Sequence, residues 1–305
     1  MPPSRLVARA LALNISAYLL WASATLLFKY LGHLPVWQVF AQRVVWSLLF
    51  CGLLLLLYRG RAAFSELYQL LRVPAHWLWL PLSSLLIASN WLLVIWAVDV
   101  GRLQEASLGY YLAPLFSLLL GKQLFQEPWR AGEPLSIGLC LLGAGLIALA
   151  GGLQQLPWAG LAIALTFAGY SALKKKLGLP PLAGLSLETL LAALPAAVYL
   201  ASLDPTASDA LGLPEYGVLV AIGAVTTLPM LFYVMSLRHL PLTTVSQLQY
   251  LNPSLMFILA VVLFKEPLSP LKMAGFGLIW GTLLWQQLGP LHTSAGVEKS
   301  SHSEH

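Results

Sequence analysis

The chain has 305 residues, of which 58% are hydrophobic and only 10% are charged. Soluble domains average about 45–50% apolar and about 25% charged residues, because polar groups must cover their surface. The composition therefore excludes an ordinary soluble protein and indicates an integral membrane protein. The two cysteines, Cys51 and Cys140, lie within apolar runs and predict neither a disulfide framework nor a metal site.

Ten apolar segments are long enough to cross a bilayer, whose hydrocarbon core of about 30 Å needs about 20 helical residues. In chain order the predicted spans are 8–28, 36–58, 76–98, 104–120, 131–150, 156–173, 185–203, 213–236, 240–263 and 269–288. No small-residue cleavage site follows the first segment into a soluble domain, so we expect it to remain as a span. The polar segment 289–305 predicts a disordered cytoplasmic tail.

Lysine and arginine gather on one side of these spans. With the N-terminus in the cytoplasm, the cytoplasmic side holds Arg5, Arg9, Arg59, Arg61, Arg72, Lys122, Arg130, Lys174, Lys175, Lys176, Arg238 and Lys299. The outer side holds only Lys29, Arg102, Lys265 and Lys272. Cytoplasmic loops carry an excess of basic residues, so both termini are predicted to be cytoplasmic. The same rule explains the net charge of +5 and the run Lys174–Lys176 without nucleic-acid binding.

An internal repeat relates the two halves of the chain. At an offset of 139 residues, Tyr111–Pro114 aligns with Tyr250–Pro253, and Leu124–Pro128 aligns with Leu263–Pro267. The repeat unit holds five spans, an odd number, so successive copies must insert in opposite directions. We therefore predict an all-α membrane protein of two inverted five-helix repeats. The first repeat covers 1–150 and the second covers 151–288.

Such inverted repeats are typical of secondary transporters, which bind solute near the bilayer midplane and work by alternating access. Pro114 and Pro253 occupy matching positions in the fourth and ninth spans, and each removes one backbone hydrogen bond. We interpret this pair as weak points that line the pathway. A proline that is simply tolerated in a membrane helix is the alternative.

Charged residues inside a bilayer are costly and indicate functional sites. Arg43 lies eight residues into the second span, about 10 Å along a helix. Glu105, at the outer start of the fourth span, is a candidate partner, and helix capping is an equally good explanation for it. Glu188 opens the seventh span, the repeat counterpart of the second; it is either a second pathway charge or a carboxylate at the cytoplasmic interface.

Uncharged polar and aromatic residues within the spans are also candidates. Amides in hydrocarbon either hold helices together or bind solute, and aromatic rings near the middle of a span can line a pocket. The spacing of Gly277 and Gly281 additionally favours close helix packing. The residues expected to line or gate the pathway are Trp21, Arg43, Asn90, Trp91, Glu105, Tyr110, Pro114, Glu188, Gln249, Tyr250, Asn252 and Pro253.

Several of these residues stand in a series of short motifs, namely Arg43–Ser47, Ser89–Leu93, Trp96–Val98, Glu105–Tyr110, Glu188–Leu190, Thr226–Pro229 and Gln249–Pro253. In this order the motifs resemble the RarD branch of the EamA-type drug/metabolite transporters, and the resemblance runs from about residue 8 to 285. It implies a ten-helix permease of the bacterial inner membrane, of a kind associated with chloramphenicol sensitivity. One departure is Ala113 before Pro114, where this branch is expected to have asparagine, whereas Asn252 precedes Pro253.

The sequence thus predicts a secondary transporter for a small metabolite or drug, with the lipid bilayer as its other partner and no cofactor. A phosphate-binding loop of the GxxxxGK[ST] type is absent from the sequence, which argues against a nucleotide-driven pump. We expect no enzyme, because the six histidines lie at helix ends or in the tail and form no metal cluster. A scaffold or receptor that binds a small molecule without transport is the alternative. Proton coupling through Glu105 and Glu188 is a further hypothesis.

Overall fold

The computed structural model describes residues 3–60, 62–100, 103–150, 158–203, 212–262 and 269–300. Every regular element in these ranges is an α-helix. The helices are α1 (Pro3–Tyr30), α2 (Val36–Arg59), α3 (Ala62–Leu71), α4 (His76–Asp99), α5 (Leu103–Phe125), α6 (Glu133–Ala150), α7 (Trp158–Leu177), α8 (Pro181–Ala201), α10 (Leu213–Leu237), α11 (Leu242–Gln249), α12 (Leu251–Val262) and α13 (Pro270–Ser300).

Six segments in the described ranges are long and apolar enough to cross a membrane. They are Arg5–Phe28, Val36–Arg59, His76–Ala97, Glu133–Ala150, Pro181–Ala201 and Leu213–Leu237. They coincide with the first, second, third, fifth, seventh and eighth predicted spans. The remaining four predicted spans coincide with α5, α7, the pair α11 and α12, and α13. In a bilayer a helix satisfies its own backbone hydrogen bonds, which explains why such a chain folds into helices.

Three details differ from the sequence prediction. A short amphipathic helix, α3, occupies the connection between the second and third predicted spans. The ninth predicted span is interrupted at Tyr250 and forms α11 and α12. The helix α13 continues to Ser300, so the structure has helix over 289–300, in the segment where the sequence predicts a disordered tail. A helix that has already started adds further residues at low cost, since nucleation is the expensive step.

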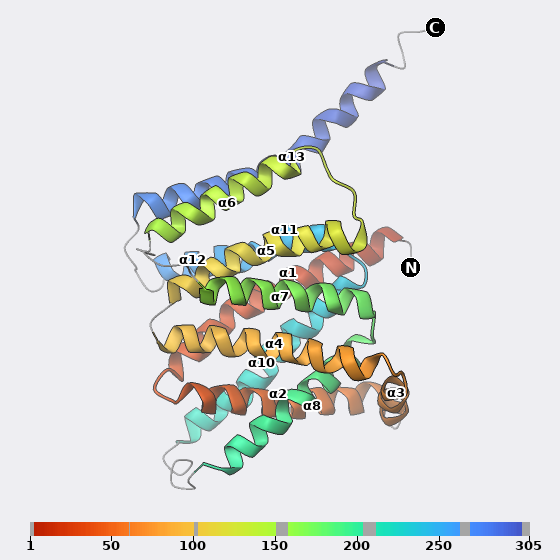
Figure 1. Cartoon of the computed structure of the whole chain (residues 1–305), viewed down its shortest axis with the longest axis vertical. Coiled ribbons are helices and arrows are strands. Elements are labelled where there is room, and N and C mark those ends of the chain that lie inside the picture. Colours follow the sequence, from red (N-terminus) through yellow and green to blue (C-terminus); the bar gives the residue numbers. More distant parts are fainter. Residues whose placement is uncertain are drawn as a thin grey trace.

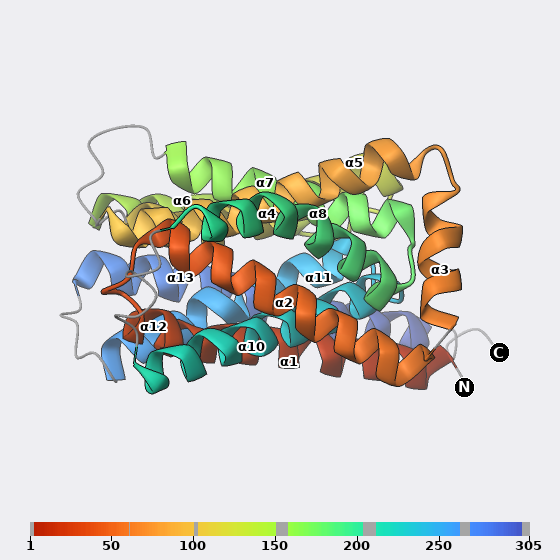
Figure 2. The ribbon, with the colours of Figure 1, turned by 90° about the horizontal axis from the view of Figure 1, so that it is seen from below.

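The long helices lie side by side and run back and forth between two ends of the molecule (Figure 1). The N-terminus of α1, the C-terminal end of α13 and α3 all lie at the same end, which we call the terminal end (Figure 2). In Figure 1, α6 and α13 form the upper edge of the stack, and α2 and α8 lie at the lower edge. The helices α1, α7 and α10, together with α11, surround the largest group of buried apolar side chains.

Proline and glycine mark several helix boundaries. Pro35 precedes α2, Pro180 precedes α8 and Pro241 precedes α11. A proline fits the start of a helix because the first N–H groups have no intrahelical acceptor. At the other ends, Gly60 after α2 and Gly178 after α7 have positive φ angles of 53° and 57°. This left-handed conformation stops a helix and favours glycine.

The helices α6 and α13 make a close contact through glycine. A Cβ atom added to Gly143 would lie 2.8 Å from the carbonyl oxygen of Gly275, and one added to Gly275 would lie 2.7 Å from that of Gly143. By contrast, a Cβ atom on Gly277 or Gly281 would meet open space. The prediction of close packing at Gly277 and Gly281 is therefore wrong, because that face of α13 is turned away from α6.

Candidate functional site

Arg43 of α2 is buried among aromatic rings from other helices. Only 4% of the Arg43 surface is exposed. The guanidinium carbon lies 3.8 Å from the ring centroid of Trp91 in α4 and 5.9 Å from that of Phe28 in α1. A guanidinium that stacks on a tryptophan face gains cation–π attraction, which is largest where water is excluded. Arg43 thus joins three helices around one positive charge.

The Nε atom of Arg43 has no hydrogen-bond partner among the described residues. In addition, no carboxylate whose side chain the structure describes lies within ion-pair distance of the guanidinium. Tyr110 of α5 lies close enough to interact with its charge. The backbone of Glu105 lies in the first turn of α5, but its side chain is outside the described residues, so the Arg43–Glu105 pair stays a prediction.

A cluster of four aromatic rings lies deeper in the bundle, and we call it the aromatic group. It consists of Tyr18 and Trp21 from α1, Phe167 from α7 and Tyr233 from α10. The ring of Trp21 lies 5.7 Å from Tyr233 and 6.1 Å from Phe167, centroid to centroid. Trp91 packs against the same apolar cluster. The predicted candidates Trp21 and Trp91 are therefore brought to one region.

Gln249 connects this group to its polar neighbours. Its amide nitrogen donates to the hydroxyls of Tyr233 at 3.2 Å and Ser117 at 3.1 Å. The Tyr233 hydroxyl also shares a hydrogen bond of 2.6 Å with Ser171. Asn90, in contrast, donates to the backbone oxygen of Ile163 at 2.8 Å. Of the two roles open to these amides, Asn90 holds α4 against α7, whereas Gln249 lies beside the aromatic group.

Glu188 lies at a separate place, towards the terminal end. It is 1% exposed and forms an ion pair of 3.0 Å with Lys174 of α7. Its carboxylate also accepts hydrogen bonds from Ser83 at 2.5 Å and Tyr170 at 3.3 Å, while Ser84 donates to its backbone oxygen. Several partners on two other helices, α4 and α7, thus compensate the charge. Glu188 is consequently not a surface carboxylate, and Lys174 does more than end its helix.

The two charged positions are equivalent within their helices. Arg43 is the eighth residue of α2 (Val36–Arg59), and Glu188 is the eighth residue of α8 (Pro181–Ala201). The two helices pack against each other and run in opposite directions (Figure 1). Each charge therefore lies about 10 Å from the start of its helix, one near each end of the molecule.

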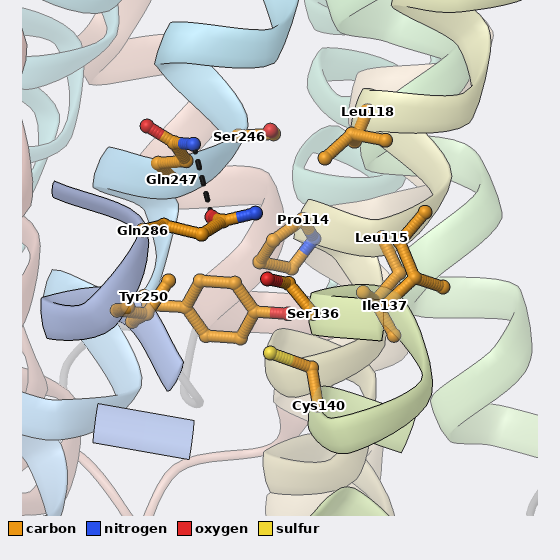
Figure 3. Close-up of a pocket in the computed structure, with 11 residues that line it drawn as sticks. Pro114, Leu115, Leu118, Ser136, Ile137, Cys140, Ser246, Gln247, Tyr250 and Gln286 are labelled. Carbon is orange, nitrogen blue, oxygen red and sulfur yellow. Dashed lines mark hydrogen bonds between the residues drawn. The ribbon is translucent and has the colours of Figure 1, made fainter. Parts of the chain in front are cut away.

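Pro114 and Tyr250 line a small cavity between α5, α6, α11 and α13 (Figure 3). Its volume of about 20 Å³ accommodates one water molecule rather than a solute. Its polar wall includes Ser136 and the pair Gln247–Gln286, which share a hydrogen bond of 3.1 Å. Asn252 and Pro253 follow in α12 and are buried, and the Asn252 side-chain oxygen accepts no hydrogen bond.

Sequence reasoning missed several members of these clusters. Phe167, Ser83 and Lys174 belong to them, but none was selected as a pathway residue. Lys174 stands four residues after Tyr170, so both fall on one helix face, yet only the fold shows that Glu188 meets them there. Spacing within one helix can reveal a shared face, whereas a partner from another helix leaves no local signal.

Comparison with known proteins agrees with this architecture. The model of the EamA-like transporter family matches residues 8–149 and 157–285. The chain is 38% identical to an uncharacterized transporter of Pseudomonas aeruginosa, covering 89% of this chain and 91% of that protein. It is 32% identical to Protein RarD of Escherichia coli over 94% and 96% of the two chains, and 28% identical to Chloramphenicol-sensitive protein RarD of Pseudomonas aeruginosa over 92% and 94%.

A crystal structure of a protein with 21% sequence identity has the same fold, with a TM-score of 0.71 over 92% of this chain and 97% of that chain. The described segments that can cross a membrane fit a multi-pass membrane protein. The relatives include several RarD proteins that are matched over most of their length. The chain therefore belongs to the EamA-like transporter family and is a RarD-type permease of the drug/metabolite transporter superfamily.

Proposed function

We propose that this permease has ten membrane spans in two inverted five-helix repeats, 1–150 and 151–288, and lies in the bacterial inner membrane with both termini in the cytoplasm. Three observations support this topology. The family model matches two successive ranges of similar length. Arg43 and Glu188 occupy equivalent positions in two oppositely directed helices. Both described chain ends lie at the terminal end (Figure 2), where most of the basic residues are expected.

The permease moves a small metabolite or drug by alternating access, and it has no catalytic activity. The observation that carries this proposal is the position of Arg43 beside the aromatic group. There, a buried guanidinium with an unfilled Nε stacks on Trp91, and Trp91 packs against the same apolar cluster as the aromatic group, whose rings come from both halves of the chain. A protein that needed this arginine only for stability would satisfy the donor internally, since an unpaired buried polar group is destabilising. Phenicol-type drugs belong among the solutes to be tested, because one relative is named for chloramphenicol sensitivity.

Flux across liposomes tests this proposal. Purified protein in liposomes should move at least one solute of a broad panel that includes metabolites and phenicol-type drugs, and Arg43→Ala should lower that flux at least about tenfold. Arg59→Ala is a matched control, because Arg59 lies at the exposed end of the same helix and pairs only with Glu66 in the described residues. Binding without flux would favour the scaffold or receptor instead. Neither flux nor binding across the panel would remove the transport function.

Proton coupling through Glu105 and Glu188 is a separate part of the proposal. Glu188 supports it because a buried carboxylate bound by a lysine and two hydroxyl groups can exchange partners when it gains or loses a proton. Coupled transport should accelerate when a pH gradient is imposed, and Glu188→Gln and Glu105→Gln should reduce that acceleration. Flux that ignores the gradient in the wild type and in both variants would exclude proton coupling while leaving transport intact.

A further inference from the structure

We propose that the solute is a small organic anion with a flat apolar body, whose acidic group binds the open edge of the Arg43 guanidinium. This inference rests on the proposed transport function and specifies its substrate class. Three features of the site support it: the uncompensated charge, the geometry of the guanidinium and the aromatic surface beside it.

The charge balance of the buried basic residues singles out Arg43. Three basic residues in the described part of the chain are buried, namely Arg43, Lys122 and Lys174. Lys122 forms an ion pair with Glu133, and Lys174 forms one with Glu188. Arg43 has no such partner among the side chains that the structure describes. Because a buried charge without a counter-charge is costly, this position favours a negatively charged ligand.

The orientation of the guanidinium leaves its Nε donor without a partner among the described residues. Its flat face is covered by the Trp91 ring at 3.8 Å, so an additional ring cannot stack on that side. The edge that carries Nε makes no hydrogen bond there. A guanidinium edge is a planar fork that matches the two oxygens of a carboxylate or phosphate. The fork of donors thus suits an oxyanion better than a neutral carbonyl compound, which offers one acceptor atom. The positive charge of the guanidinium repels an organic cation.

The aromatic surface beside Arg43 defines the rest of the ligand. Trp91 and Trp21 are both half-buried and pack against one apolar cluster with Phe167. Neither indole N–H donates a hydrogen bond to a described residue, so both remain available to a ligand. Flat rings bind other flat apolar groups by stacking and edge contacts.

A matched series of three compounds separates charge from shape. Phenylacetate, phenylacetamide and 2-phenylethylamine share one ring and a short chain, and they carry a negative, a zero and a positive charge at neutral pH. The binding of each is measured as a rise in the unfolding midpoint of the full chain in detergent, and counterflow of labelled phenylacetate into liposomes measures transport. Phenyl phosphate serves as a second anion.

The wild type should bind the two anions at least about tenfold more tightly than the amide or the amine, as expected for a charge-assisted hydrogen-bonded pair. Arg43→Gln should abolish this preference, and Arg43→Lys should retain part of it because the charge remains but the fork is lost. Arg59→Gln should leave the preference unchanged, since it removes an exposed positive charge from the same helix.

Two results would overturn the inference. The first is equal or tighter binding of the amide or amine by the wild type, which needs no variant to fold. The second is an anion preference that appears only after Glu105→Gln, which would mean that Glu105 already compensates Arg43. Transport of neutral solutes in either case would leave the proposed function standing. Anion binding with no flux of any solute would instead refute the transport function and preserve the anion site.

Discussion

At the residue scale, Glu188 illustrates how a charge is accommodated inside the bundle. The carboxylate is buried with Lys174 at 3.0 Å, and Ser83 and Tyr170 donate to its two oxygens. A buried ion pair gains little net stability relative to apolar side chains, because both ions lose their hydration. Removing one partner is far worse, since the other charge is then left alone. The pair therefore acts as a unit that joins α4, α7 and α8.

This coupling predicts a non-additive pair of mutations. Glu188→Gln and Lys174→Gln should each lower the free energy of unfolding by about 3–5 kcal/mol, and the double variant should lose clearly less than the sum. Chemical unfolding in micelles measures all three values. Glu66→Gln breaks the exposed Arg59–Glu66 pair at 3.3 Å and provides the control, with an expected loss of less than about 1 kcal/mol. Additive losses would show that the two charges do not depend on each other.

Among helices, the two matching prolines have different effects. Pro114 lies inside α5, which stays continuous from Leu103 to Phe125. Pro253 lies three residues after the interruption between α11 and α12 at Tyr250. In each case the proline has no N–H for the carbonyl four residues earlier. At Pro253 that carbonyl belongs to Gln249, whose side chain also binds the hydroxyl of Tyr233. The helix interruption, which the Pro253 region has and the Pro114 region lacks, therefore lies beside the aromatic group.

If this interruption serves as a hinge, Pro253→Ala should stiffen it. The new N–H can bond to the Gln249 carbonyl, so we expect the free energy of unfolding to rise by about 1 kcal/mol while transport slows. Unfolding in micelles and initial flux into liposomes measure the two effects. Pro114→Ala is the matched comparison and should change transport less, because α5 is already continuous. Equal effects of both variants on flux would argue against a hinge at Tyr250.

Glu127 links the end of α5 to the start of α11. Its two carboxylate oxygens accept hydrogen bonds from the backbone N–H groups of Leu242 at 2.7 Å and Thr243 at 2.9 Å, at the start of α11. The first N–H groups of a helix lack intrahelical acceptors, and a negative charge there is favourable. A residue that follows α5 thus caps a helix of the other half of the chain.

Loss of this cap should be measurable both globally and locally. Glu127→Ala should lower the free energy of unfolding by about 1–2 kcal/mol and speed hydrogen exchange at the amides of Leu242 and Thr243. Glu127→Gln keeps a side-chain acceptor, so its free energy of unfolding should fall by less than that of Glu127→Ala. Gln123→Ala, at an exposed position of α5, should change neither quantity. Unchanged exchange at both amides in Glu127→Ala would mean that the cap contributes nothing in the membrane.

For the whole molecule, the arrangement of the chain ends makes the topology testable. The short helix α3 lies at the terminal end, across the ends of the long helices (Figure 2), whereas the connection between α1 and α2 lies at the opposite end. Ser65 in α3 and His33 in that connection are both exposed. The native cysteines Cys51 and Cys140 are buried, so they should react slowly.

A membrane-impermeant maleimide should therefore label the two positions from opposite sides. Ser65→Cys should react only in inside-out vesicles and His33→Cys only in intact cells with a permeabilised outer membrane, as expected if the terminal end is cytoplasmic. Labelling of both positions from one side would contradict the proposed topology. A reversed pattern would keep the ten-span plan but invert its orientation.

Local information in the sequence was sufficient for the helices. Apolar segments of about 20 residues must form helices in lipid, because only a helix satisfies its own backbone there, so the predicted spans coincide with helices of the structure. Buried charge is costly wherever it occurs, so Arg43 and Glu188 could be selected before any partner was known. The structure differs from the predicted spans at α3, at Tyr250 and after Leu288. At each of these places the helical and non-helical conformations of the backbone differ by little free energy.

Partners could not be determined from the sequence alone. Lys174 lies beside Glu188, Glu127 caps α11, and Trp91 stacks on Arg43 because of how separate helices pack. The helix period places residues on a face of their own helix but contains no information about the neighbouring helix. Composition and periodicity therefore determined that this protein is a bundle of apolar helices with a few internal charges. Only the tertiary structure decided that Lys174 neutralises Glu188 and that Nε of Arg43 has no partner among the described residues, because both depend on contacts between residues far apart in the chain.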